Sequence, residues 1–256
     1  MMLNNIREYP QKEKSDNMQE IKGKCVSQGI AFGKILFYSN NISNVQKYTV
    51  DDTDAELQRY KKALEPAVSR LKSLYYDTRK NIGENESVIF QTHIMILEDA
   101  QFIKNVEDVI VKNKLNAEYA VYATALKIAE MFKKINDEYL QQRYFDILDS
   151  ANTLLEILEP ETRNFHDTEK LIIAAAQLLP SDIVRFKEFD CLGFITNTGA
   201  ENSHAAILAR STKLPAVINI NEDLSRFDGL SAIIDGHNNK IIIQPDDDTL
   251  ALYKIK

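Results

Sequence analysis

Cysteine is scarce in this chain, since its 256 residues include only Cys25 and Cys191. The two lie far apart and lack the spacing of metal ligands, which argues against a disulfide framework and against a zinc site. We interpret both as buried thiols. Basic residues are outnumbered, because 31 Lys and Arg stand against 38 Asp and Glu, for a formal charge of -7. This balance argues against non-specific nucleic-acid binding and favours a basic protein partner.

Long hydrophobic runs are also missing. Residues 1–20 are polar and hold no apolar segment of the kind found in secretory signals, so we expect a poorly ordered extension there. The longest apolar stretch, Leu171 to Pro180, is broken by Gln177 and has half of the roughly 20 residues that cross a bilayer. We therefore expect no membrane insertion and a cytoplasmic location.

Glycine and proline are rare in the middle of the chain. Between Asp51 and Glu159 there is one glycine, Gly83, and one proline, Pro66, whereas the other seven glycines lie outside this block. Both residue types interrupt helices, so their distribution predicts a helical domain inserted into an α/β domain. We assign residues 51–160 to a bundle of about four helices and 21–50 with 161–245 to the α/β domain.

Apolar spacing and capping residues predict the helices. Thr53-Asp54-Ala55-Glu56 is a capping box that starts the first helix, and Pro66 is expected to bend it. Asn116 is a predicted N-cap for a long helix that reaches toward Leu158. The stretch from Val88 to Leu97 is apolar on more than one side, so it is either deeply buried or covered by a partner.

Short β-branched runs outside the helical block predict the strands of one sheet. The candidates are Ile30–Phe37, Lys170–Ala176, Leu192–Asn197, Ala216–Asn219, and a hairpin over 233–243 with a polar turn. His237 lies in that turn and His166 in a connection between domains, and we interpret both as surface histidines. The run Asp246-Asp247-Asp248 is interpreted as a helix cap rather than a metal site, and 246–256 as the start of a linker helix.

One segment, Leu192 to Arg210, combines a strand, a loop of small residues and a helix. Asn202 or Ser203 can cap that helix, which puts His204 in its first turn among unpaired backbone N–H groups. The helix dipole favours a neutral imidazole, and the N–H groups favour phosphoryl oxygens. The pattern suits phosphoryl transfer through His204, although a capping histidine on an ordinary helix explains the same spacing.

At these residues the chain resembles the N-terminal half of enzyme I of the bacterial phosphoenolpyruvate-dependent sugar phosphotransferase system. That family's phosphohistidine signature has two glycines, a basic residue, threonine or serine, a small residue and histidine; here it is Gly199-Ala200-Glu201-Asn202-Ser203-His204. Further similar stretches are Ser27–Lys34, Ile89–Asp99, Asp137–Arg143 and 209–217. The similarity spans about residue 21 to the C-terminus.

The resemblance implies a swivelling phosphohistidine domain in which His204 collects phosphate from phosphoenolpyruvate and passes it to the carrier protein HPr. It implies a phosphate-binding loop, with Arg210 as a possible support, and a helical insertion that docks HPr. The loop residues are Gly199, Ala200, Asn202, Ser203 and Arg210, and the docking residues are Glu84, His93, Met95, Asp99 and Arg143.

The family also implies a phosphoenolpyruvate-binding barrel that uses Mg²⁺ and mediates dimerisation. The barrel is missing here, so we expect this chain to need no metal or other cofactor, to be a monomer, and not to use phosphoenolpyruvate by itself.

Three departures from the pattern keep alternatives open. Glu201 stands where the family has a basic residue, Ala200 replaces the second glycine, and Ile183 aligns with a threonine that contacts the active histidine. These changes suit a divergent module that binds HPr or regulates it with weakened or lost transfer. A swivelling domain of a pyruvate phosphate dikinase or phosphoenolpyruvate synthase is a third reading, which the long helical insertion argues against. For the docking segment, the alternative is that Met95 belongs to the bundle core and His93 is a satisfied histidine.

Overall fold

A computed structural model describes residues 18–159, 170–187, 189 and 191–254. Its described residues form a mixed eight-stranded sheet in the order β1-β8-β7-β3-β4-β5-β6-β2. Neighbours from β3 to β6 run parallel, and the outer pairs run antiparallel. The strands are β1 Gln19–Lys22, β2 Lys24–Ser27, β3 Ile30–Tyr38, β4 Leu171–Ala175, β5 Cys191–Thr196, β6 Ala216–Ile218, β7 Ser231–Asp235 and β8 Lys240–Ile243.

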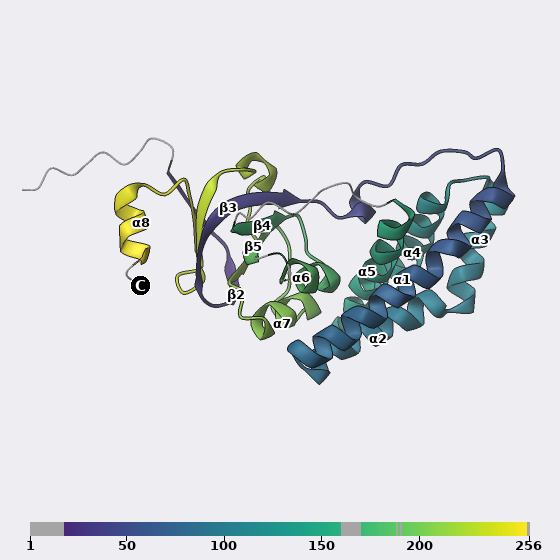
Figure 1. The fold of residues 1–256 in the computed structure, drawn as a ribbon, viewed down its shortest axis with the longest axis horizontal. Coiled ribbons are helices and arrows are strands. Elements are labelled where there is room, and N and C mark those ends of the chain that lie inside the picture. Colours follow the sequence, from purple (N-terminus) through teal and green to yellow (C-terminus); the bar gives the residue numbers. More distant parts are fainter. Residues whose placement is uncertain (1–17, 160–169, 188, 190, 255–256) are drawn as a thin grey trace, which may run out of the picture.

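Five helices follow β3 and precede β4, and they form a separate bundle beside the sheet (Figure 1). The sheet part carries three more helices and two short 3-10 turns, η1 Asn41–Ser43 and η2 Leu224–Phe227. The bundle helices are α1 Thr53–Asn81, α2 Glu84–Glu98, α3 Ala100–Asn113, α4 Ala117–Lys133 and α5 Glu138–Leu158. The helices of the sheet part are α6 Pro180–Lys187, α7 His204–Ser211 and α8 Asp247–Lys254.

Side chains from the two faces of the sheet pack into two separate hydrophobic cores. Along β4, Ile172 and Ala174 point into one core with Phe227 of η2, while Ile173 and Ala175 point into the other. Side chains alternate between the faces of a strand, so β4, buried on both, reads as a continuous apolar run. The second core is continuous with that of the bundle, where Leu154 is fully buried. Helices α6 and α7 lie on this side, facing the bundle (Figure 1).

The predicted fold class, an α/β domain with an inserted helical bundle, is confirmed, but several local predictions are wrong. Asp52, not Thr53, caps α1, because its carboxylate accepts a hydrogen bond from the Ala55 N–H at 2.9 Å. The long helix predicted from Asn116 toward Leu158 is broken between α4 and α5. Helix α1 continues through Pro66, and the bend expected there stays a prediction.

The N-terminal strands were not predicted. Strand β1 begins at Gln19, inside the expected extension, and pairs with β8 through Gln19 and Ile243. Strand β2 pairs with β6. The hairpin of β7 and β8 agrees with the prediction, and Asp246 caps α8 by accepting the Thr249 N–H at 2.8 Å.

Candidate functional site

His204 is the first residue of α7, directly after the loop that leaves β5. Ser203 is the N-cap, with φ -66° and ψ 153°, and its side chain accepts a hydrogen bond from the Ala206 N–H at 3.2 Å. Of the two candidate caps, Ser203 therefore fills the role. The cap fixes the start of the helix, so the His204 side chain leaves the chain where first-turn N–H groups lack helical partners.

The loop before His204 is anchored to the ends of neighbouring strands. The Asn197 side chain donates to the carbonyls of Ile220 and Glu222 at 2.8 and 2.6 Å. The Thr198 hydroxyl donates to the Ala176 carbonyl at 3.1 Å, just after β4. These bonds hold the loop at the carboxyl edge of the parallel strands, where α/β folds commonly bind ligands.

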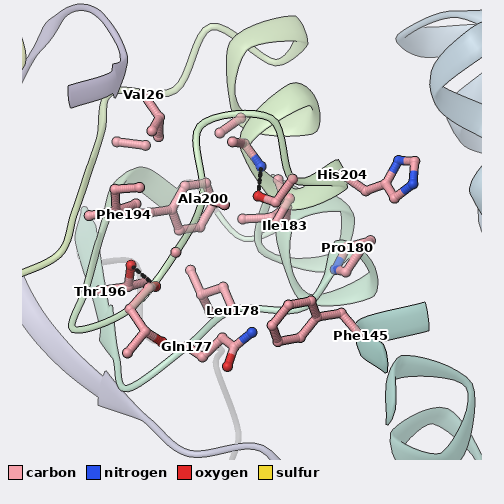
Figure 2. A pocket seen from close by; sticks show the side chains of 18 of the residues that line it. Val26, Phe145, Gln177, Leu178, Pro180, Ile183, Phe194, Thr196, Ala200 and His204 are labelled. Atoms are coloured by element: carbon pink, nitrogen blue, oxygen red, sulfur yellow. Dashed lines mark hydrogen bonds between the residues drawn. The ribbon is translucent and has the colours of Figure 1, made fainter. Parts of the chain in front are cut away.

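A cavity of about 290 Å³ lies between this loop, α6, α7 and α5 of the bundle. Figure 2 shows the His204 ring projecting at the side of the cavity where Pro180 and Phe145 lie. Residues on its wall include Gly199, Ala200, Ser203 and His204 from the loop and α7, Pro180 and Ile183 from α6, and Gln142, Phe145 and Asp146 from α5. Both parts of the molecule thus contribute to the surroundings of His204.

The environment of His204 favours its neutral form. Its side chain is half-buried, and burial lowers the pKa of the imidazole below its ordinary value. The carboxylate of Asp146 raises this pKa, whereas His93 and Arg143 lower it. Burial is the largest of these influences, so at neutral pH the ring has a free nitrogen lone pair.

Glu201 does not point toward the cavity that holds His204. Its carboxylate forms an ion pair with Lys24 of β2, and both side chains are more than half exposed. Glu201 lines a separate surface hollow together with Lys24. Ala200 is likewise compatible with the loop, because it is not among the described residues with positive φ.

Arg210 and Asn202 support the loop from outside the cavity. The Arg210 guanidinium donates to the carbonyls of Glu201 and Val26 at 2.9 and 3.3 Å, which ties the loop to β2. The Asn202 carbonyl accepts a hydrogen bond from the Gln142 side chain of α5 at 3.5 Å. Of the five predicted loop residues, Gly199, Ala200 and Ser203 therefore line the cavity and these two do not.

The residues assigned to partner docking separate into two groups. Glu84 and Asp99 are exposed, and Met95 of α2 leaves 71% of its surface exposed. Arg143 is half-buried and donates to Asp146 at 3.0 Å. His93 has no exposed surface, so this structure does not offer its imidazole to a partner. Neither of its ring nitrogens has a hydrogen-bond partner within the described residues, so it is not a satisfied core histidine either.

The described residues among the remaining candidates, Cys25, Cys191 and His237, do not line this cavity. His237 is exposed in the turn between β7 and β8, and His166 lies outside the described residues. Cys191 is buried, but Cys25 is only half-buried, contrary to prediction. Among the described residues no cluster of histidine, cysteine and carboxylate side chains fits a metal ion, and no helix is long and apolar enough to cross a membrane.

Sequence reasoning missed the contribution of α5 to the site. Asp146 and Asp149 are buried carboxylates three positions apart in a helix that also buries Ser150, Asn152 and Thr153. Carboxylates are almost never fully buried unless they have a partner, so two of them on a core-facing helix stripe are a signal of a polar contact. Only the packing of α5 against α6 reveals what that contact is.

Comparison with known proteins identifies two family segments. Residues 22–143 match the family described as PEP-utilising enzyme, N-terminal, and residues 167–239 match PEP-utilising enzyme, mobile domain. The phosphoenolpyruvate-protein phosphotransferase of Priestia megaterium is 32% identical over 243 residues, which are 93% of this chain and 42% of that protein. The Bacillus subtilis protein of the same name is 31% identical over 246 residues, with the same coverage. The chain thus spans less than half the length of these relatives.

Solved structures agree over nearly the whole length of both chains. A solution structure described as Enzyme I (nEIt) is 31% identical, with a TM-score of 0.71, over 92% of this chain and 97% of its own. A structure described as the N-terminal domain of Enzyme 1 - Nitrogen has a TM-score of 0.66 at 22% identity, which supports the fold alone. The chain therefore belongs to the enzyme I family and corresponds to the N-terminal part of its phosphoenolpyruvate-protein phosphotransferases.

Proposed function

We propose that this chain carries a phosphoryl group on His204, between phosphoenolpyruvate in a longer protein and the carrier HPr. The observation that supports this most strongly is the half-buried His204, held neutral by its surroundings at the first position of α7. A neutral imidazole is a nucleophile, and the amides around the helix N-terminus can stabilise the oxygens of an arriving phosphoryl group.

The exchange with HPr is a displacement at phosphorus between two imidazoles. A lone pair on a ring nitrogen of His204 forms the new N–P bond while the N–P bond of the donor phosphohistidine breaks. The electron pair of the broken bond returns to the donor ring, and the second nitrogen of His204 keeps its proton. No water, metal or redox partner is needed for this step, and it runs in both directions.

The loop residues have distinct roles in this proposal. Ser203 fixes the first turn of α7, and Gly199 and Ala200 let the backbone approach the phosphoryl group. Arg210 and Asn202 hold the loop in position without contacting phosphate. Glu201, paired with Lys24, leaves the approach to His204 free of a repelling charge.

We place HPr docking on the exposed face of α2 and the start of α3. Glu84, Val88 and Met95 are exposed on α2, and Asp99 follows at its end. An apolar strip with acidic neighbours suits a partner with basic residues. Helix α2 also packs against α7, because Ser211, at the opposite end of α7 from His204, donates a hydrogen bond to Glu86 of α2 at 2.9 Å.

The proposal extends to the arrangement of the protein. Residues 51–160 are the docking domain, and 21–50 with 161–245 are the phosphohistidine domain. The chain acts as a monomer in the cytoplasm, and phosphoenolpyruvate and Mg²⁺ act through a barrel outside this sequence. Ile183 is the one observation that favours the alternative, a docking module with weakened transfer, because it puts an apolar side chain in the cavity of His204.

The test is intact-protein mass after mixing this chain with phosphorylated HPr under non-acidic conditions. We expect one added phosphoryl group in the unmodified chain and none in His204→Ala. Binding of HPr without added mass would support the docking module instead. Equal phosphorylation of His204→Ala would refute the assignment of the acceptor.

A further inference from the structure

Asp146 is a buried carboxylate on the wall of the cavity that holds His204. Its side chain is 1% exposed, and one oxygen, Oδ2, accepts a hydrogen bond from Arg143 at 3.0 Å. The other oxygen, Oδ1, has no hydrogen-bond partner among the described residues. A buried oxygen left in this way costs free energy, so its presence calls for a physical reason.

The neighbours of Asp146 hold it in place but do not supply that partner. His93 of α2 lies 4.0 Å from Asp146 Oδ1 through Nε2 and 3.6 Å from Asp149 Oδ2 through Nδ1. Asp149 is bound in turn by Ser181 of α6, through its hydroxyl and through its N–H at 3.0 Å. The cluster of His93, Asp146 and Asp149 is thereby fixed relative to α6 and the cavity.

Among the residues that the structure describes, no carboxylate other than that of Asp146 lines the cavity of His204. Helix α6 contributes Ile183 to the cavity, whereas its titratable residues Asp182 and Arg185 are bound to Tyr38 and its Lys187 is exposed. The Ser203 hydroxyl accepts from the Ala206 N–H. The titratable groups that act on His204 are Asp146 and Arg143 of α5 and His93 of α2. Only Asp146 carries a negative charge.

We propose that Asp146 is a positioning residue for His204, whose carboxylate attracts the imidazole and opposes the positive charge of Arg143 beside it. The inference rests on the proposed function of His204 as phosphoryl acceptor. The proposal explains why the Oδ1 atom of Asp146 is left without a hydrogen-bond partner among the described residues. It also assigns the positioning of His204 to α5 of the bundle, because Ile183 of α6 has no polar side-chain atom for that role. The bundle then does more than dock a partner, because its charged groups contribute to the proton affinity of the acceptor.

The test is the titration of His204 in the whole chain, followed by NMR of 15N-labelled histidine side chains. Asp146→Asn preserves the shape and removes the charge, so we expect the His204 midpoint to fall by about half a pH unit or more. Arg143→Met removes a positive charge from the same neighbourhood and is expected to raise the midpoint. Asp108→Asn, which breaks an exposed ion pair with Lys112 on α3, is the matched control and leaves the midpoint unchanged.

The sign of the shift separates positioning from a structural effect. If Asp146→Asn merely released α5 from α6, His204 would lose its burial and its midpoint would rise toward the ordinary histidine value. A rise, or no shift, overturns the proposal. Should Asp146→Asn fail to fold, Arg143→Met carries the test alone, and an unchanged or lowered midpoint there overturns it.

A kinetic measurement links the proposal to transfer. Asp146→Asn is expected to slow phosphoryl acceptance from phosphorylated HPr at saturation by about tenfold while leaving the affinity for HPr unchanged. Loss of affinity with unchanged maximal rate would contradict a positioning role. The titration needs no phosphoryl donor, so it remains informative even if His204→Ala shows that the proposed function is wrong.

Discussion

Ser181 at the start of α6 donates two hydrogen bonds, from its hydroxyl and its backbone N–H, to the buried carboxylate of Asp149 on α5. The contact joins the helical bundle to the sheet part beside the cavity of His204. Burial raises the pKa of Asp149, and the bonds from Ser181 act in the opposite direction by favouring its charged form. The orientation of the bundle on the sheet therefore depends on a polar contact as well as on the shared apolar core.

Ser181→Ala is expected to lower the free energy of unfolding by about 1.5 to 3 kcal/mol, because it removes a donor from a buried charged group. Urea unfolding of the variant and the unmodified chain measures the difference. Ser225→Ala is the control, since Ser225 is exposed and its hydroxyl donates to the nearby carboxylate of Asp223. Equal stability of all three proteins would show that the Ser181 hydroxyl contributes nothing to this contact.

The stability of the fold should also depend on the protonation of Asp182. Burial raises the pKa of this residue to about 7, above its value of about 4 in an unfolded chain. The folded state then keeps a proton that the unfolded state loses, so the stabilisation is complete below about pH 4 and is lost as pH rises to about 7.

The side-chain amide in Asp182→Asn does not titrate over this pH range. The free energy of unfolding of the unmodified chain, minus that of Asp182→Asn, should therefore decrease from about pH 4 to about pH 7 and stay level above. The other groups, including His204, are common to both proteins and cancel in the difference. A constant difference over this range would rule out the raised pKa.

Glu201→Gln should change the rate of phosphoryl transfer by less than about twofold, because the carboxylate is exposed and faces Lys24 rather than His204. Quench-flow mixing with phosphorylated HPr gives the rate of transfer. Lys24→Gln, which removes the other side of the ion pair, is measured beside it. Acceleration by tenfold or more in Glu201→Gln would mean that the carboxylate does repel the phosphoryl group.

Met95→Asp should weaken HPr binding at least about tenfold, because it puts a charge in the centre of the proposed apolar strip among acidic neighbours. Calorimetric titration measures the affinity. Met131→Asp on α4 is the matched control, since Met131 is 56% exposed and lies on a different helix. If the two substitutions weaken binding equally, the α2 surface is not the docking site.

Local patterns in the sequence predicted the elements that local physics determines. Ser203 was one of two candidate caps, and the strand, loop and helix around His204 follow from small residues, a cap and apolar spacing. The hairpin of β7 and β8 was predicted because its polar turn separates two apolar runs. The cap at Asp52 was missed because Thr53 and Glu56 also satisfy the spacing of a capping box, while Glu56 instead bonds to the Ala117 N–H.

Long-range packing accounts for what the sequence did not predict. Strand β1 is a strand because β8 pairs with it from more than 200 residues away, and its four residues carry little signal of their own. The burial of His93 and the contribution of Asp146 to the His204 cavity arise where α2 packs against α5 and α7 and where α5 packs against α6. Neither depends on residues adjacent in sequence, so no local pattern distinguishes His93 from an exposed docking residue.

The central claim is that a nitrogen of His204 carries the phosphoryl group. The most direct measurement is NMR of the chain with 15N-labelled histidine after phosphorylation by HPr, with His204 assigned through His204→Gln. We predict a phosphorus coupling on one ring nitrogen of His204 and on no nitrogen of His93, His166 or His237. Phosphorylation that leaves the His204 nitrogens uncoupled, or that persists in His204→Gln, would contradict the account.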